Sequence, residues 1–298
     1  MTPSRFNLGL IGYPLERSLS PHIHHAALHS CGLQGEYRLY PVAPLPEGRE
    51  ALEHMILRLR QSSLHGLNVT IPHKQNVLPY LDELTPAARS VGAANTLYLQ
   101  NGRLTGDNTD IPGFLADLKR QLPGVTGKAL VLGAGGSARA VVYALLNSGW
   151  QVVVAARRLE QAISLTSFPS PLGGRTRPEL AEGVGDEDQH PSAQAVLLDA
   201  PGLAGVPDVR LVVNATPVGM IPQPDASPWP ESLPLPSGAA IYDLIYKPLE
   251  TRLMRQARQA GLLAFNGLGM LVEQAALSFE RWTGASVNRA AIWEAISS

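Results

Sequence analysis

Short apolar runs recur along the chain and alternate with longer stretches of helical periodicity. In the first third, the apolar runs span residues 6–12, 35–42, 66–71 and 94–99. Apolar residues at helical spacing occupy the intervening stretches 21–32 and 47–61. Strands that alternate with helices in this way are typical of α/β folds.

A second alternation begins at residue 129 and continues to about residue 246. Its apolar runs lie at 129–132, 150–156, 211–217 and 239–246. Two helical patterns, 269–284 and 287–298, close the chain. At 298 residues the length favours two domains. Residues 167–192 are rich in Gly, Pro and charge without a clear period, and we interpret them as a surface connection.

Residues 129–158 have the length and pattern of one βαβ unit with a glycine turn. Gly133, Gly135 and Ala138 satisfy the G-x-G-x-x-[GA] pattern directly after a strand and at the start of a helix. Glycines there allow a tight turn and the close approach of a pyrophosphate, whose charge the helix N-terminal amides carry. The pattern predicts a dinucleotide site, although glycine turns also occur as purely structural features.

The end of the following strand bears on which dinucleotide binds. An NAD site usually has an acidic residue there for the ribose hydroxyls, whereas this chain reads VVVAARR and has no acid before Glu160. Arg157 and Arg158 suit a ribose 2′-phosphate, because guanidinium groups make charge-assisted hydrogen bonds to phosphate. The sequence therefore favours NADP; the alternative is two solvated arginines after a strand.

Polar side chains follow the apolar runs of the first third. Ser18 and Ser20 stand two residues apart, so in an extended chain their hydroxyls point the same way and suit a carboxylate. The alternative role of Ser20 is a helix N-cap before Pro21. Lys74 comes three residues after the run 66–71, and Asp110 comes after the run 94–99. An ammonium beside a carboxylate is a common proton-transfer arrangement, but their spacing is equally compatible with a surface ion pair.

Composition limits the range of partners. A formal net charge of -1 and 16% charged residues give no basic stripe, which argues against nucleic acid or an anionic membrane as main partner. We expect neither an export signal nor a transmembrane helix. Cys31 is the only cysteine, which fits a reduced compartment and excludes Cys-based metal clusters. His22, His24 and His25 lack further ligands at a metal-site spacing, so we interpret them as exposed positions near a helix start.

Eight segments, in order, resemble the signature segments of the shikimate dehydrogenase family over nearly the whole chain. They are GYPLERSLSP, NVTIPHK, GAANTL, GDNTDIPGF, GAGGSARA, NATPVGM, YDLIYKP and GLGMLVEQAA. The resemblance implies an N-terminal α/β substrate domain, a Rossmann-type NADP-binding domain and C-terminal helices that return to the first domain. It implies a substrate-binding and catalytic domain of 1–111 plus 267–298, and an NADP-binding domain of 112–266.

The resemblance also implies the roles of individual residues. Lys74 and Asp110 would be the catalytic pair. The residues that would bind the substrate are Ser18 and Ser20 at its carboxylate, Asn68, Thr70, Asn95 and Gln274 at its ring hydroxyls, and Tyr246. Those that would bind the cofactor are Gly133, Gly135, Gly136, Ala138, Arg157, Arg158, Asn214, Thr216, Met220, Gly267 and Met270.

The implied activity is the NADP-dependent interconversion of 3-dehydroshikimate and shikimate in aromatic amino-acid biosynthesis, by a cytoplasmic monomer or homodimer without a metal. Lys74 would exchange the proton at the reacting oxygen, and Asp110 would orient the Lys74 ammonium and the substrate hydroxyl. Arg17 and His25 stand where the family commonly has His and Asn, and Ala156 where it has Asn. A dual quinate/shikimate dehydrogenase and a catalytically silent NADP-binding regulatory protein remain alternatives.

Overall fold

The chain folds into two compact units. The computed structural model describes residues 5–166 and 192–297. One unit comprises Met1–Gly113 with Leu271–Ser298, and the other Phe114–Met270. The chain leaves the first unit within α4 (Asp110–Gln121) and returns within α9 (Leu268–Thr283). Apart from Ser192, the surface connection expected at 167–192 lies outside the described residues.

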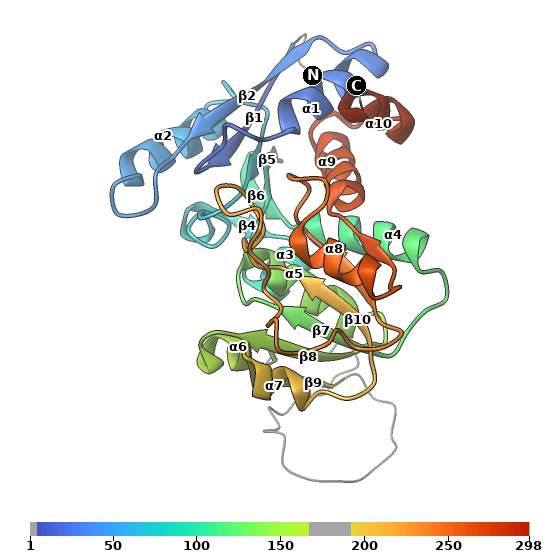
Figure 1. The fold of residues 1–298 in the computed structure, drawn as a ribbon. Helices are drawn as coiled ribbons and strands as arrows, with labels where there is room; N and C mark the ends of the chain where they lie inside the picture. Colours follow the sequence, from blue (N-terminus) through green and yellow to red (C-terminus); the bar gives the residue numbers. More distant parts are fainter. Residues whose placement is uncertain (1–4, 167–191, 298) are drawn as a thin grey trace. The chain divides into compact units, whose positions relative to one another are not determined.

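The first unit is built on a mixed six-stranded sheet with the order β2-β1-β3-β5-β6-β4 (Figure 1). Its strands are β1 (Phe6–Gly12), β2 (Gly35–Pro41), β3 (Gly66–Val69), β4 (Glu83–Leu84), β5 (Thr96–Gln100) and β6 (Arg103–Asp107). Its own helices are α1 (Ser20–Ser30), α2 (Arg49–Arg60), the 3₁₀ turn η1 (Leu78–Tyr80), α3 (Pro86–Val91) and α10 (Arg289–Ser297).

The direction of the strands changes within this sheet. β1 runs parallel to β2 and β3, whereas β5 is antiparallel to both β3 and β6. A two-residue turn joins β5 to β6, and Asn101 (φ 52°) and Gly102 (φ 76°) both adopt the left-handed conformation. Asn-Gly is the preferred pair for such hairpin turns. The hairpin places β6, which precedes Asp110, next to β5 and two positions from β3 in the sheet.

Both faces of β1 are covered by apolar side chains. Leu8 and Leu10 face a cluster with α1, α9 and α10, whereas Ile11 faces a second cluster with α2 and β3. Within the unit, α10 packs against α1 (Figure 1). The expected return of the C-terminal helices to the first domain is confirmed.

The second unit contains a fully parallel sheet with the order β12-β11-β10-β7-β8-β9. Its strands are β7 (Lys128–Leu132), β8 (Gln151–Ala156), β9 (Ala193–Leu197), β10 (Val209–Asn214), β11 (Ala240–Asp243) and β12 (Ala264–Phe265). Its own helices are α5 (Gly136–Leu146), α6 (Leu159–Thr166), α7 (Ala200–Ala204) and α8 (Arg252–Gln259). In chain order this is the 3-2-1-4-5-6 arrangement of dinucleotide-binding domains, with its switch point between β7 and β10. The predicted Rossmann-type fold is confirmed.

Among the residues that the structure describes, no helix combines the length and the apolar character needed to span a bilayer.

Candidate active site

Lys74 and Asp110 form a buried ion pair in the first unit. The Lys74 Nζ lies 2.7 Å from the Asp110 Oδ2, and the two side chains are only 10% and 6% exposed. Lys74 follows the turn after β3, and Asp110 is the first residue of α4. The alternative of a surface ion pair is therefore wrong. A pair held this far from solvent keeps a fixed geometry, which suits proton transfer.

Asn95 connects this ion pair to the surrounding loops. Its Nδ2 donates to the Asp110 Oδ1 at 2.9 Å and to the Thr109 Oγ1 at 3.0 Å. Its Oδ1 accepts from the Thr109 backbone N–H at 2.8 Å. Both carboxylate oxygens of Asp110 thus have a donor, one from Lys74 and one from Asn95. The arrangement fixes the carboxylate plane, as a residue that orients a proton carrier requires.

Gln274 joins this group from α9. Its Oε1 accepts from the Asn95 Nδ2 at 3.4 Å. A Cβ on Gly113 would lie 2.8 Å from the Gln274 Cβ and backbone N, so α4 and α9 approach closely at this glycine. Gln274 and Asn95 are 179 residues apart in sequence. Within the first unit the structure therefore brings together four of the predicted residues: Lys74, Asn95, Asp110 and Gln274.

Asn68 lies beneath this group in a second layer of hydrogen bonds. Its Oδ1 accepts from the Tyr37 hydroxyl at 2.8 Å, and its Nδ2 donates to the Ser278 Oγ at 3.0 Å and to the Asn95 backbone O at 3.1 Å. The Thr96 and Ser278 hydroxyls are 2.7 Å apart. Sequence reasoning missed Tyr37, Thr96 and Ser278. Ser278 stands four residues after Gln274, one helical turn along the same face, so its position was detectable.

Ser18 and Ser20 lie on the loop that leaves β1. The Ser18 Oγ accepts from the Ser20 backbone N–H at 3.2 Å. Ser20 is the first residue of α1 and the preceding Leu19 has helical dihedrals, so both the extended-chain argument and the N-cap role of Ser20 are wrong. Thr70 leaves the neighbouring strand β3, and its methyl group occupies the space that a Cβ on Gly12 would need. The two loops therefore leave the sheet side by side.

The α1 histidines differ from the prediction at one position. His22 and His25 are exposed, but His24 is fully buried and stacks on the Tyr37 ring with centroids 4.2 Å apart. Burial lowers the pKa of His24 to about 3, so its ring is neutral. Within residues 5–166 and 192–297, no group of three or more His, Cys, Asp or Glu side chains is placed to hold a metal ion.

In the second unit the glycine turn connects β7 to α5. Gly133 has φ +107°, and a Cβ there would lie 3.0 Å from the Thr216 Cγ2. A Cβ on Gly135 would meet nothing within 4 Å, so the space above this residue is open. No side chain caps α5 at Gly135, and Gly136 begins the helix. Open space at the first turn of a helix, beside the strand-order switch, suits a pyrophosphate.

Other predicted cofactor residues surround this turn. Ala138 is fully buried on α5, which allows the helix to pack closely against the sheet. Arg157 and Arg158 are exposed directly after β8, and neither forms an ion pair within the described part of the chain. The two arginines after β8 therefore suit a nucleotide that carries a 2′-phosphate.

The loop after β10 is held by a buried carboxylate that sequence reasoning missed. Asp243 Oδ1 accepts from the Asn214 Nδ2 and the Ile245 backbone N–H, each at 3.0 Å, and its Oδ2 accepts from the Thr251 hydroxyl at 2.7 Å. Asn214 in turn accepts from the Thr216 hydroxyl at 2.7 Å. Burial outweighs these hydrogen bonds and raises the pKa of Asp243 to about 6.

The remaining predicted residues of the second unit lie near the ends of β10 and β11. Met220 is 43% exposed, whereas Met270 is buried at the start of α9. Gly267 donates its N–H to the Ile245 backbone O at 3.1 Å, and a Cβ there would collide with the Leu244 carbonyl. Tyr246 is half-buried, and burial raises the pKa of its hydroxyl.

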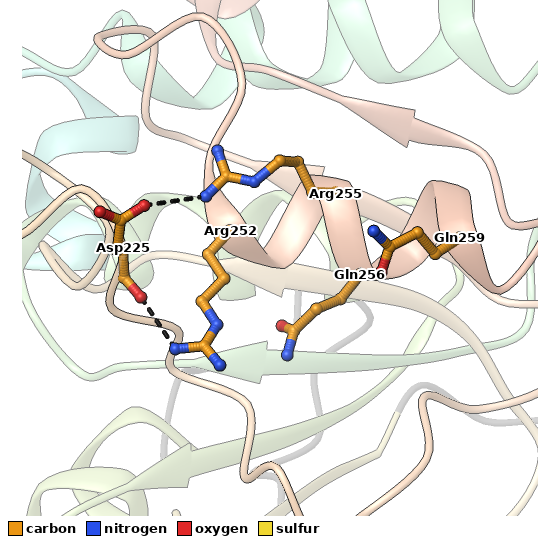
Figure 2. Close-up of a pocket in the computed structure, with 5 residues that line it drawn as sticks. All are labelled: Asp225, Arg252, Arg255, Gln256 and Gln259. Carbon is orange, nitrogen blue, oxygen red and sulfur yellow. Dashed lines mark hydrogen bonds and ion pairs between the residues drawn. The ribbon is translucent and has the colours of Figure 1, made fainter.

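A polar hollow of about 370 Å³ lies along α8, and none of the predicted site residues lines it. Figure 2 shows Arg252 and Arg255 bonded to Asp225 at its edge, at 3.0 Å and 3.1 Å. Arg252 also pairs with Glu231. The charges of the hollow are already compensated, and we assign it no role.

Comparison with known proteins gives a consistent picture. The family described as shikimate dehydrogenase substrate binding domain matches residues 10–97, and the one described as shikimate 5′-dehydrogenase C-terminal domain matches residues 267–296. The shikimate dehydrogenase (NADP(+)) of Salinibacter ruber is 41% identical over 294 residues, which are 96% of this chain and 95% of that protein.

Two solved structures extend the comparison. Shikimate 5-dehydrogenase from Thermus thermophilus, in complex with NADP(H) and shikimate, is 38% identical with a TM-score of 0.80, and 98% of each chain is covered. Quinate dehydrogenase from Corynebacterium glutamicum, in complex with NAD, is 29% identical with a TM-score of 0.83, covering 98% of this chain and 99% of that one. Backbone similarity alone therefore does not separate the two substrates.

Proposed function

Because the chain belongs to the shikimate dehydrogenase family, we propose that it interconverts 3-dehydroshikimate and shikimate with NADP. The observation that carries the proposal is the buried Lys74–Asp110 pair with Asn95 bonded to the same carboxylate. A silent regulatory protein on this fold would have no need of a desolvated ammonium–carboxylate pair, which is costly to bury.

Most of the residues proposed to bind the substrate belong to the first unit. The Ser18 and Ser20 loop binds the carboxylate of the substrate, and Asn68, Thr70, Asn95 and Gln274 bind its ring hydroxyls. The supporting geometry is the shared edge from which the β1 and β3 loops leave the sheet, together with the Asn95–Gln274 contact. We assign Tyr246 to the same substrate, and residues 1–111 plus 267–298 to the substrate-binding and catalytic domain.

Residues 112–266 are proposed as the NADP-binding domain. The open space at Gly135 and the first turn of α5 suit the pyrophosphate, with Gly133, Gly136 and Ala138 shaping the turn. Arg157 and Arg158 bind the 2′-phosphate. The other residues assigned to the cofactor are Asn214, Thr216, Met220, Gly267 and Met270.

The chain's own residues handle the proton. When bound, NADP supplies or removes a hydride at the ring carbon that is a ketone in 3-dehydroshikimate and an alcohol in shikimate. Lys74 donates a proton to the ketone oxygen on reduction and accepts it from the hydroxyl on oxidation. Asp110 orients the Lys74 ammonium through its Oδ2. Asn95 donates to the Asp110 Oδ1 and so keeps the carboxylate in one orientation.

Quinate is the second candidate substrate, since the quinate dehydrogenase fold matches this chain closely. Two features favour shikimate with NADP: the paired serines, because quinate carries an extra hydroxyl near its carboxylate, and the arginines after β8. Turnover of both acids with NADP and with NAD tests the choice. We also propose that the protein acts in a reducing compartment such as the cytoplasm and does not bind nucleic acid. It is a monomer or a homodimer, and light scattering distinguishes these two states.

A further inference from the structure

Asp117 on α4 is a buried carboxylate that the proposed reaction does not use. Its side chain is 0% exposed. It accepts hydrogen bonds from the Tyr242 hydroxyl, from Arg120 and, at 3.4 Å, from the Gln121 Nε2. Burying a carboxylate is unfavourable unless its oxygens are well bonded, so these partners account for how it is tolerated.

Tyr242 links this carboxylate to the start of α9. Its ring lies at the end of β11, fully buried and edge-to-face against Phe114, with the centroids 5.2 Å apart. Its hydroxyl donates to the Asp117 Oδ2, and the Met270 backbone N–H is near enough to the hydroxyl to lower its pKa. Burial and the neighbouring Asp117 raise the pKa of Tyr242 well above its usual range, so the hydroxyl keeps the proton that it donates to Asp117.

Gly269 brings the same carboxylate against the backbone. A Cβ at this position would overlap the Asp117 Cγ and both its oxygens. Leu268, Gly269 and Met270 form the first turn of α9, where the amide groups have no partner within the helix. A carboxylate at this end of a helix is favourable because it faces the positive end of the helix dipole. The start of α9 is thus fixed to α4 and β11 through one acid and one phenol.

We propose that Asp117 and Tyr242 are positioning residues for the nicotinamide end of the cofactor, because they fix the backbone of residues 267–270. The inference rests on the proposed function, in which Gly267 and Met270 lie against the nicotinamide. Neither residue touches the substrate or the reacting atoms. They determine the position of residues 267–270 alone. Their loss should therefore weaken the binding of the nicotinamide and leave the binding of the phosphates and the adenine unchanged.

The test compares three variants of the full-length protein. Tyr242→Phe removes only the hydroxyl and keeps the ring against Phe114, and Asp117→Asn keeps the shape of the acid without its charge. Tyr80→Phe is the control, since it removes another tyrosine–carboxylate hydrogen bond, to Glu53 at 3.1 Å, between two residues assigned neither to the substrate nor to the cofactor. Folding of each is verified by its unfolding transition.

Two readouts need no turnover. Hydrogen exchange at the Met270 amide should accelerate about tenfold in Tyr242→Phe, because the variant loses the hydrogen bond that holds the Asp117 carboxylate against Gly269. The Kd for NADP should rise about tenfold in Tyr242→Phe and to a smaller extent in Asp117→Asn. The Kd for 2′-phospho-ADP-ribose, which lacks the nicotinamide ring, should stay within about twofold, and Tyr80→Phe should change none of these quantities.

Equal weakening of NADP and of 2′-phospho-ADP-ribose would overturn the inference, because it would mean a general loss of the fold around the cofactor site. Unchanged Met270 exchange in Tyr242→Phe would also overturn it. If the wild-type protein binds NADP but does not oxidise shikimate, the proposed function fails while these binding comparisons still decide the inference. If the wild-type protein binds neither NADP nor the fragment, both fail.

Discussion

Asp243→Asn should remove a pH-dependent cost of burying a carboxylate in the second unit. The pKa of Asp243 is raised from 3.8 to about 6, with burial as its largest cause. A rise of about two pKa units corresponds to a free-energy difference of about 3 kcal/mol between the two protonation states. Asparagine has the same shape and no charge, so it should not carry this cost at neutral pH.

The direction of the effect follows from the pKa values. Because the folded protein binds this proton more tightly than the unfolded chain, the stabilising contribution of Asp243 is complete below about pH 3.8 and is lost as the pH rises through about 6. In Asp243→Asn the amide oxygen still accepts from Asn214 and Ile245, and the Thr251 hydroxyl can turn to accept from the new amide N–H. The variant should therefore be as stable as the wild type or more so at pH 8.

The assay is the free energy of unfolding of both proteins by urea between pH 8 and pH 4. Taking the difference between them at each pH cancels the titration of all other groups. As the pH falls, we expect the wild type to gain up to about 3 kcal/mol of unfolding free energy relative to Asp243→Asn. Thr251→Val, which removes a donor that lowers the pKa of Asp243, should move the midpoint of the wild-type slope to higher pH. A difference that does not vary with pH would refute the reasoning, as would a loss of several kcal/mol at pH 8.

Three further predictions concern other residues. Lys74→Ala or Asp110→Ala should lower kcat by about 10³ with the Kd for NADP within about twofold, in steady-state kinetics and titration; full activity in either variant would contradict their assignment. Arg157→Ala and Arg158→Ala should together weaken NADP about tenfold or more while NAD binding changes little, and equal losses for the two nucleotides would contradict a 2′-phosphate site. The pKa of His24 is lowered from 6.5 to about 3, so its contribution to stability is complete above pH 6.5 and is lost as the pH falls toward 3. Between pH 7 and pH 5, the free energy of unfolding of His24→Gln in urea should therefore fall by about 2 kcal/mol less than that of the wild type. Identical falls in the two proteins would refute the burial argument.

The order of strands and helices was largely predictable from the period of apolar residues. The two closing helices were predicted at 269–284 and 287–298, and the structure has them at Leu268–Thr283 and Arg289–Ser297. β6 and the antiparallel direction of β5 were not predicted, because β6 has little apolar alternation and much of it is polar. The Asn101-Gly102 pair was the signal that could have revealed the hairpin.

The site was predictable as a set of residues but not as a geometry. Spacing along the chain did not decide whether Lys74 and Asp110 meet in the core or at the surface, because that depends on how β3 and α4 pack. Asp117 and Asp243 escaped notice for a related reason: a buried acid is indistinguishable in sequence from a solvated one until its hydrogen-bond partners are known. Tyr242, the buried partner of Asp117, lies 125 residues away in sequence. Ser18 and Ser20 show the converse, where a local argument assumed an extended chain that the start of α1 does not permit.

The central claim is tested most directly by following the absorbance of reduced nicotinamide after the purified protein is mixed with shikimate or quinate, each with NADP and with NAD. The account predicts a fast signal for shikimate with NADP, and a much slower one when either quinate or NAD replaces its counterpart. Silence in all four mixtures, from folded protein that still binds NADP, would contradict the assigned activity and favour a regulatory role, with Arg17→His and His25→Asn as the first variants to make.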